Sequence, residues 1–368
     1  MKIILFANTD WYLYNFRLPL AKALKDLGHD VILLSPHGND YSDRILRAGF
    51  DWRVIELSRT SINPINEIGT IISLISLYKK EKPDIVHHFT IKCVLYGSFA
   101  ARKAGVKQIV NAVTGMGYIF TSQNIFTILA KPIVRSLYRW VLKGSSVIFQ
   151  NETDLKYFVD KGLVSSNLAT LIPSSGVDIK RFKPQKEEQG IPLVILPARM
   201  LWDKGVQEYV EAAELVKQSE IQARFVLVGD VDKGNPSSIP VEQLQKWQEE
   251  GFIEWWGWRE DMAQVYQMAN VVCLPSYGEG LSKTLIEAAA CGRPLVTTDI
   301  PGCREVVENG VNGLLVQKGN GIELAAALIF LLSDVELMHK MGIESRRIAV
   351  KDYSVEKVVK ETLNVYNN

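Results

Sequence analysis

Two glutamates eight positions apart, Glu279 and Glu287, are the residues of this chain best suited to hold a hydroxylated ligand. Glu279 lies in a turn between two glycines, and Glu287 lies two turns into an apolar helix predicted at 281–291. At a rise of about 1.5 Å per residue, the two carboxylates are about 10–12 Å apart. That separation is too wide for carboxylates that share a proton, and wider than the ~5–9.5 Å spacing of glycosidases. It suits contacts to hydroxyl groups on two different rings of one ligand.

The turn that carries Glu279 also predicts an anion site. A buried strand at 271–274 leads into the turn, and the helix follows directly. The first N–H groups of a helix have no partner within it and lie at the positive end of its dipole. The backbone around Gly280, Leu281 and Ser282 is therefore suited to bind a phosphate.

Two cations follow another predicted strand, at 193–198. Arg199 and Lys204 emerge where this strand ends, and together they can hold a diphosphate, arginine through its planar fork and lysine as a point charge. A pair with this spacing is weak evidence alone. Combined with the phosphate site near Glu279, it predicts a ligand whose diphosphate lies between two hydroxylated groups.

The elements that position these residues follow a repeated β-α pattern. Short buried strands are predicted at 2–7, 30–35, 52–56, 85–88, 109–112, 147–151 and 169–172, and after a polar linker at 185–190 they resume at 193–198, 224–228, 253–256, 271–274, 294–297 and 313–316. Helices fit between most of them. This pattern predicts an α/β fold of two domains with parallel sheets, in which ligands bind at the carboxyl ends of strands. A functional cleft is expected between the two domains.

These residues resemble a known family. The segment from Glu279 to Glu287, with its continuation E-A-A-A-C-G-R-P, resembles the Glu-x7-Glu element of the retaining glycosyltransferases of family 4. The A-R-x4-K-G element at Arg199 and Lys204 is similar to the family's diphosphate-binding pair. The segments at 171–182 and 300–316 match two further signatures, although Ser175 stands where asparagine is usual.

The resemblance implies a GT-B architecture of two Rossmann-like domains. An acceptor-binding domain is expected at 1–185, a nucleotide-sugar domain at 186–345, and a C-terminal helix at 346–368 that packs back on the first domain. The implied donor is a UDP-linked sugar, a hexose or an N-acetylhexosamine, with neither a metal nor another cofactor.

The resemblance also implies residue roles in the donor domain. Glu287 would bind the ribose hydroxyls and Glu279 the donor-sugar hydroxyls. The diphosphate would be held by Arg199, Lys204 and the backbone N–H groups of Gly280, Leu281 and Ser282, and the uracil would lie near Arg259 or the backbone at Trp258. Arg199 and Lys204 would then stabilise the leaving diphosphate as its negative charge develops.

Two departures from the usual family pattern concern the acceptor domain. Many members carry His-x-His after the fourth strand, whereas this chain has His87 and His88 side by side, which places the second histidine on the opposite face of the strand. The loop at 8–11 also lacks the usual glycines. The segments at 14–19, 87–92 and 113–120 resemble members that act on polyprenyl-diphosphate-linked sugars. The implied acceptor contacts are Asn15, Arg17, His88, Lys92, Thr114 and Gly115, with His87 as a structural residue.

The charge of the chain is divided unequally. Its net charge is +1, yet residues 1–185 carry 24 Lys and Arg against 14 Asp and Glu, and the remainder 18 against 27. Within the basic half, Lys131, Arg135, Arg139 and Lys143 recur every four residues along a predicted helix at 125–143. A basic stripe beside apolar residues predicts contact with an anionic membrane surface. The alternative is an ordinary amphipathic helix that packs on its own sheet.

Composition excludes several other classes. The four cysteines form no C-x-x-C pair, so neither a structural zinc site nor a disulfide scaffold is expected. The apolar runs at 3–7 and 68–78 are too short for a signal peptide or a membrane span, which predicts a cytoplasmic protein without an integral anchor. The family resemblance implies a peripheral place on the inner face of the cell membrane, with no nucleic-acid partner. No G-x-G-x-x-G follows a strand, which disfavours a nicotinamide enzyme. A transferase for small soluble acceptors, an inactive nucleotide-sugar-binding subunit and a pyridoxal-dependent phosphorylase remain as alternatives.

Overall fold

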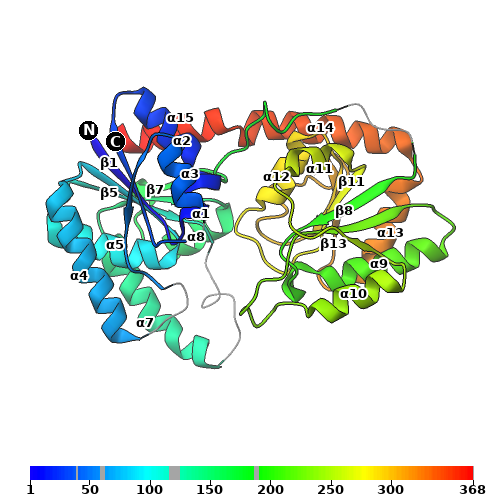
Figure 1. Cartoon of the computed structure of the whole chain (residues 1–368), viewed down its shortest axis with the longest axis horizontal. Coiled ribbons are helices and arrows are strands. Elements are labelled where there is room, and N and C mark those ends of the chain that lie inside the picture. The colour runs from blue at the N-terminus through cyan, green and yellow to red at the C-terminus, as the bar shows by residue number, and fades with distance from the viewer. Residues whose placement is uncertain (39, 59–62, 116–124, 186–189, 368) are drawn as a thin grey trace. The chain divides into compact units, whose positions relative to one another are not determined.

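The computed structural model describes residues 1–367 except 39, 59–62, 116–124 and 186–189. Its contacts divide the chain into two compact units. Unit 1 comprises Met1–Gly176 and Glu356–Asn368, and unit 2 comprises Val177–Val355. The divisions predicted from the sequence are at 185/186 and 345/346. The long helical segment at the C-terminal end passes from unit 2 into unit 1 where α14 gives way to α15 (Figure 1).

Unit 1 is built on a parallel sheet of seven strands in the order β3-β2-β1-β4-β5-β6-β7. The strands are β1 (Lys2–Phe6), β2 (Asp30–Ser35), β3 (Asp51–Val54), β4 (Ile85–Phe89), β5 (Gln108–Val113), β6 (Ser146–Phe149) and β7 (Ala169–Leu171). The main helices are α2 (Leu18–Asp26), α3 (Tyr41–Arg47), α4 (Pro64–Glu81), α5 (Ile91–Ala104), α7 (Ile125–Leu142), α8 (Glu152–Asp160) and α15 (Val355–Asn367). A short helix α1 (Asp10–Tyr12) and a π-helical turn (Leu13–Arg17) precede α2.

Alternate residues of each strand in unit 1 pack on opposite faces of the sheet, as the two-residue period of a strand requires. Ile3 and Leu5 face α2, α3 and the C-terminal helix α15. Ile4 and Phe6 face α4 and α5. On the far side of α5, helices α7 and α8 pack against β5 and β6. The sheet is therefore covered on both faces, which explains why its central strands are buried and largely apolar.

Unit 2 contains a parallel sheet of six strands in the order β10-β9-β8-β11-β12-β13. The strands are β8 (Leu193–Pro197), β9 (Arg224–Val228), β10 (Glu254–Trp255), β11 (Val271–Leu274), β12 (Leu295–Thr298) and β13 (Gly313–Val316). The helices are α9 (Val206–Gln218), α10 (Val241–Glu249), α11 (Met262–Met268), α12 (Lys283–Ala290), α13 (Gly321–Leu332) and α14 (Val335–Tyr353). Helices α11 and α12 cover one face of the sheet, and α9, α10 and α13 cover the other.

Both sheets reverse their strand order at one point. In unit 1 the reversal lies between β1 and β4, and in unit 2 it lies between β8 and β11. Loops that leave adjacent strands at such a point diverge, so ligands of open α/β sheets bind there, at the carboxyl ends of the strands. The α/β fold predicted from the sequence is confirmed.

Candidate functional site

The candidate site in unit 2 lies at the strand reversal, where the loops after β8 and β11 meet. Lys204 comes from the first loop and Glu279 from the second, and Lys204 Nζ donates to Glu279 Oε1 at 2.6 Å. Their side chains are only 18% and 15% exposed. The Tyr277 N–H also donates to the carbonyl of Asp203 at 2.8 Å, which joins the two loops through their backbones. Residues 75 positions apart thus form one site.

Gly205 permits this close approach. It ends the short helical turn Trp202–Lys204 with a φ of +71°, a conformation that favours glycine. A Cβ at this position would lie 2.1 Å from the carbonyl oxygen of Pro275, in the other loop. Only glycine therefore fits between the two loops, and its neighbour Lys204 is positioned as a result.

A second glycine supports the turn that carries Glu279. Gly302 has a φ of +85°, and a Cβ there would lie 2.6 Å from the carbonyl oxygen of Glu279. The Ser282 N–H donates to the carbonyl of Gly302 at 3.0 Å, and the Ser282 hydroxyl accepts from the N–H of Leu285 at the start of α12. The Ser282 N–H predicted to bind phosphate therefore has a partner in the protein, and the helix begins at Lys283 rather than at 281.

Arg199, the second predicted phosphate ligand, also has a carboxylate partner. Its Nη1 donates to Asp232 Oδ2 at 2.5 Å. Asp232 lies in the loop after β9 and accepts a further hydrogen bond from Asn235 Nδ2 at 3.0 Å. Asp232 is not among the residues predicted from the sequence, although its place after β9, the strand next to β8, is a usable signal. Both cations at this edge are thus neutralised by carboxylates.

Glu287 lies on α12 with its side chain largely buried. The Tyr266 hydroxyl donates to its Oε2 at 3.4 Å, and Lys283 Nζ lies 3.7 Å from its Oε1. Burial raises the pKa of this carboxyl group, against the opposing effect of the nearby Lys283 and Arg181. A largely buried carboxylate with weak partners is well suited to accept hydrogen bonds from ligand hydroxyls.

The two residues predicted near a base differ in their surroundings. Arg259 forms a two-point ion pair with Asp261, with distances of 2.7 and 2.6 Å, and its guanidinium lies 5.6 Å from the centroid of the Trp256 ring. Trp258 is exposed and follows Gly257, which accepts a backbone hydrogen bond from Gly229 at the end of β9. The Trp258 ring is therefore available for stacking, whereas Arg259 already has a partner.

In unit 1, the residues predicted to contact an acceptor lie in or after the adjacent strands β1, β4 and β5. Arg17 is buried, its Nη2 donates to the Tyr12 hydroxyl at 2.8 Å, and its guanidinium lies 4.2 Å from the centroid of the Phe89 ring. Its Nε has no hydrogen-bond partner among the described residues. Asn15 lies in the same turn, where its side chain donates to the carbonyl of Trp11.

The two histidines of β4 are both core residues. His88 faces α4 and α5, where its Nε2 lies 3.1 Å from the Tyr78 hydroxyl and its Nδ1 lies 2.9 Å from Asn111 Oδ1. Burial lowers the pKa of His88 to about 4. His87 points to the opposite face, where its Nδ1 lies 2.7 Å from the Tyr366 hydroxyl of α15. His88 would have to leave the core to contact a ligand.

The remaining predicted acceptor residues lie nearer the surface. Lys92, in the first turn of α5, pairs with Glu67 of α4 at 2.8 Å and donates to the carbonyl of Ser58 at 2.9 Å. Thr114 and Gly115 follow β5 and are half-buried, and most of the predicted 113–120 segment lies outside the described residues. Arg17, Lys92 and Thr114 thus share the carboxyl edge of one sheet.

The predicted basic stripe on α7 is only partly directed outward. The Arg135 guanidinium donates twice to the Tyr157 hydroxyl of α8, at 2.9 and 2.6 Å. Arg139 donates to the carbonyls of Gly162 and Lys161 just after α8. Lys131 is half-buried and Lys143 is exposed. Two of the four cations therefore stabilise the contact between α7 and α8. Of the apolar residues on this helix, Leu137 and Trp140 are exposed, and the side chains at 125–130 and 133 lie outside the described residues.

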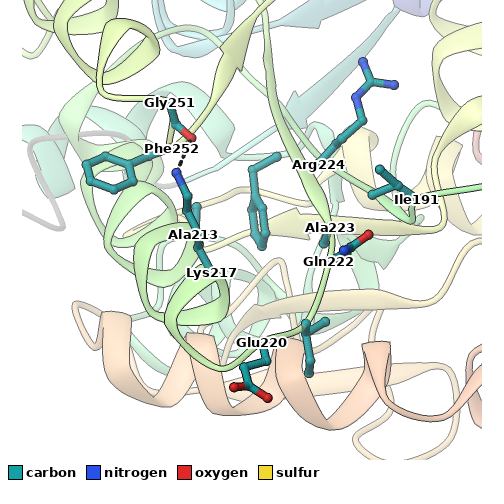
Figure 2. A pocket seen from close by; sticks show the side chains of 11 residues that line it. Ile191, Ala213, Lys217, Glu220, Gln222, Ala223, Arg224, Gly251 and Phe252 are labelled. Atoms are coloured by element: carbon teal, nitrogen blue, oxygen red, sulfur yellow. Dashed lines mark hydrogen bonds between the residues drawn. The ribbon is translucent and has the colours of Figure 1, made fainter.

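Other features of the described chain contribute little to a site. No group of three His, Cys, Asp or Glu suited to a metal occurs among the described residues, and within them no helix has the length and apolarity for a membrane span. A surface cavity of ≈ 440 Å³ in unit 2 is lined by Ile191, Lys217 and Arg224, among others (Figure 2). Ile191 and Arg224 precede or begin strands β8 and β9, so this cavity lies at the edge opposite Lys204 and Glu279.

Comparisons with known proteins identify the family. Residues 2–152 match the family described as glycosyl transferase 4-like, and residues 191–334 match glycosyl transferases group 1. The crystal structure of Anabaena Alr3699/HepE in complex with UDP and glucose aligns with a TM-score of 0.81 over 100% of both chains, at 18% identity. The chain belongs to the GT-B glycosyltransferases.

Similar proteins span most or all of this glycosyltransferase. The N,N'-diacetylbacillosaminyl-diphospho-undecaprenol alpha-1,3-N-acetylgalactosaminyltransferase of Campylobacter jejuni is 29% identical over 100% of this chain and 98% of its own. The UDP-Gal:alpha-D-GlcNAc-diphosphoundecaprenol alpha-1,3-galactosyltransferase of Escherichia coli is 26% identical over 89% of this chain and 85% of its own. The sucrose-phosphate synthase structure from Thermosynechococcus elongatus has a TM-score of 0.80 at 18% identity and covers 100% of this chain and 98% of its own.

Proposed function

We propose that this glycosyltransferase moves a hexose or N-acetylhexosamine from a UDP-sugar to a polyprenyl-diphosphate-linked saccharide, with retention of configuration and without a metal. The observation that carries the proposal is the group formed by Lys204, Glu279, Arg199 and Glu287 at the carboxyl edge of the unit 2 sheet. Two cations and two carboxylates there match the charge and hydroxyl pattern of a nucleoside-diphosphate sugar. The UDP complex of the similar Anabaena protein supports uracil as the base.

In the proposed complex, the diphosphate takes the place of two protein carboxylates. Arg199 leaves Asp232 and Lys204 turns from Glu279, so that each cation contacts a phosphate oxygen instead. Glu279 is then free to accept hydrogen bonds from the donor sugar, and Glu287 accepts them from the ribose. The N–H groups at Gly280 and Leu281 and the positive end of the α12 dipole add to the anion site. The uracil stacks near Trp258.

The proposed reaction replaces the bond between the sugar and the diphosphate with a bond to an acceptor hydroxyl on the same face of the ring. Lys204 and Arg199 stabilise the leaving diphosphate as its oxygen gains negative charge, which lowers the barrier electrostatically. That oxygen then accepts the proton of the incoming hydroxyl. No protein nucleophile and no metal take part in this proposal, which follows the mechanism implied by the family resemblance.

The acceptor is proposed to bind unit 1 at the carboxyl edge of β1, β4 and β5. A polyprenyl-diphosphate saccharide requires cations there, and Arg17 and Lys92 supply them, while Asn15, Thr114 and Gly115 offer polar contacts to the sugar. The Campylobacter and Escherichia relatives, both named as transferases for diphospho-undecaprenol sugars, support this choice. Because such an acceptor is anchored in a bilayer, we place the enzyme as a peripheral protein on the cytoplasmic face of the cell membrane.

The test is a transfer assay with defined components. UDP-hexoses and UDP-N-acetylhexosamines are first screened for thermal stabilisation of the protein, and those that stabilise it are then assayed with a polyprenyl-diphosphate sugar in detergent. Transfer with retained anomeric configuration, unchanged by a chelator, supports the proposal. Transfer only to small soluble acceptors would contradict the proposed acceptor, and loss of activity with a chelator would contradict the metal-free mechanism.

A further inference from the structure

Helix α4 of unit 1 exposes a line of isoleucines. Ile65, Ile68 and Ile72 are 79%, 57% and 61% exposed. Their spacing of three and four residues places them on one face of the helix. Single exposed apolar residues are ordinary on a protein surface, but a contiguous apolar stripe marks an interaction surface.

The charged residues of α4 are arranged in a distinct way around this stripe. Its two carboxylates are largely buried in ion pairs, Glu67 with Lys92 at 2.8 Å and Glu81 with Lys2 at 3.2 Å. The exposed residues of the helix include no acidic one: they are Ile65, Asn66, Ile68, Gly69, Ile72, Ser73, Ser76, Lys79 and Lys80. The exposed face of α4 is therefore apolar near its start and basic near its end.

We propose that this exposed face of α4 lies in the interface of an anionic membrane. A helix with isoleucines and lysines but no acid on its outer face buries apolar surface among the acyl chains and attracts anionic headgroups. The proposal rests on the proposed lipid-linked acceptor. It assigns the membrane contact to α4 rather than to the arginines of α7, which donate to Tyr157 and to backbone carbonyls beside α8.

The same helix adjoins the proposed acceptor site. Glu67 lies between Ile65 and Ile68 in the sequence, and it is the partner of Lys92 at the start of α5. Thr70, one turn further, donates to the carbonyl of Glu56 in the segment after β3. The first turns of α4 are thus fixed to the carboxyl edge of the unit 1 sheet. With the isoleucines inserted in a membrane, the diphosphate groups of its lipids would lie near Lys92.

The test compares two double variants of the full-length protein. Ile68→Asn with Ile72→Asn removes the stripe, and Ile322→Asn with Phe330→Asn removes two residues of similar exposure, 68% and 57%, from α13 of unit 2. Binding is measured by sedimentation with vesicles of phosphatidylglycerol and phosphatidylcholine at low salt. We expect the α4 variant to bind on the order of tenfold more weakly or worse, since each isoleucine loses its apolar burial, and the α13 variant to bind like the wild type.

A third double variant, Lys79→Gln with Lys80→Gln, tests the basic end of the helix. It should weaken binding to anionic vesicles without making that binding more dependent on salt.

Several outcomes would overturn the proposal. One is that the α4 variant binds vesicles as tightly as the wild type, and another is that the wild type binds no vesicles. A third is that the wild type forms a dimer in analytical ultracentrifugation and the α4 variant does not, since the stripe would then join two copies of the chain. Transfer to a detergent-solubilised acceptor should be unchanged in the α4 variant. If the wild type binds vesicles but catalyses no such transfer, the proposed function is contradicted, whereas the assignment of the exposed face of α4 to the membrane still stands.

Discussion

Replacing Lys204 by methionine keeps most of the side-chain volume and removes the charge. In the structure this leaves Glu279, which is 15% exposed, without the cation that donates to it at 2.6 Å. A hydrogen bond to a charged group contributes about 1.5–3 kcal/mol, and removal of one partner from a fully buried pair costs about 3–5 kcal/mol. Because both side chains keep some contact with solvent, we expect Lys204→Met to lower the free energy of unfolding by about 2 kcal/mol.

The same variant should lose turnover for a separate reason. If Lys204 stabilises the leaving diphosphate, removal of its charge should lower kcat about 10²–10³-fold, the range found when one preorganised donor is removed from a transition state. Unfolding cannot account for such a loss, since a protein stable by about 5–15 kcal/mol stays folded after losing 2 kcal/mol.

A second variant separates the two effects. In Lys204→Met with Glu279→Gln the unpaired charge is absent, so the free energy of unfolding from denaturant titration should recover most of its loss while turnover stays low. Lys246→Met is the control, because Lys246 and Glu250 form an exposed pair at 3.8 Å and its loss should change stability by less than about 0.5 kcal/mol. The reasoning is refuted if turnover returns together with stability, or if Lys204→Met turns over like the wild type.

Four further predictions follow from described features. Asp232→Asn should bind UDP about two- to fivefold more tightly in calorimetry, because its carboxylate no longer competes for Arg199, a partly exposed pair; weaker binding would mean that Asp232 positions the arginine. Glu287→Gln should bind UDP more weakly yet unfold at a higher denaturant concentration at pH 7. Burial raises the pKa of Glu287 in the folded state, so the contribution of this carboxyl group to stability is favourable below its unfolded pKa and is lost as the pH rises through its folded pKa. The stability gained by Glu287→Gln at pH 7 should therefore vanish near pH 4. An equal gain at both pH values would contradict this explanation. Gly205→Ala should lower stability by about 2 kcal/mol or more and reduce kcat, since its Cβ would collide with Pro275. Thr90→Gly should raise stability by about 1 kcal/mol in denaturant titration, because Thr90 has a φ of +71° and a ψ of 154°; an unchanged or lower value would show that its side chain compensates for the strain.

The arrangement of strands was predictable because each strand is short, apolar and followed by a clear stop. The predicted strands at 30–35, 224–228, 271–274 and 313–316 coincide with the observed β2, β9, β11 and β13. Gly205 and Gly302 could likewise be recognised in the sequence, because a positive φ favours glycine at those positions.

The pairing of the site residues was not predictable. Arg199 and Lys204 were identified as cations for phosphate, but their carboxylate partners lie 33 and 75 positions away, and only the adjacency of β8 to β9 and β11 brings them together. A sequence pattern shows which residues leave the same edge of a sheet. It does not show which of them form ion pairs in the free protein.

The histidines and arginines of unit 1 show a second limit. Strand alternation correctly placed His87 and His88 on opposite faces, but only the fold shows that Asn111 and Tyr78 hold His88 in the core. On α7, a four-residue period identified a basic face without showing that α8 packs beside it, or that Tyr157 of α8 and the carbonyls just after α8 accept hydrogen bonds from Arg135 and Arg139. Periodicity defines a face of a helix but not what covers that face.

The division of the chain has a consequence for its synthesis. Unit 2 is one continuous segment, whereas unit 1 needs Val358, Val365 and Tyr366 from α15 to complete the core beneath β1 and β4. The ribosome therefore adds every residue of unit 2 to the chain before it completes α15. Unit 1, whose first strand is made earliest, cannot complete its core until α15 has been added. The usual order, in which the N-terminal domain is completed first, cannot hold for unit 1, and a nascent chain stopped before α15 would leave apolar residues of β1 and β4 uncovered for chaperones to protect.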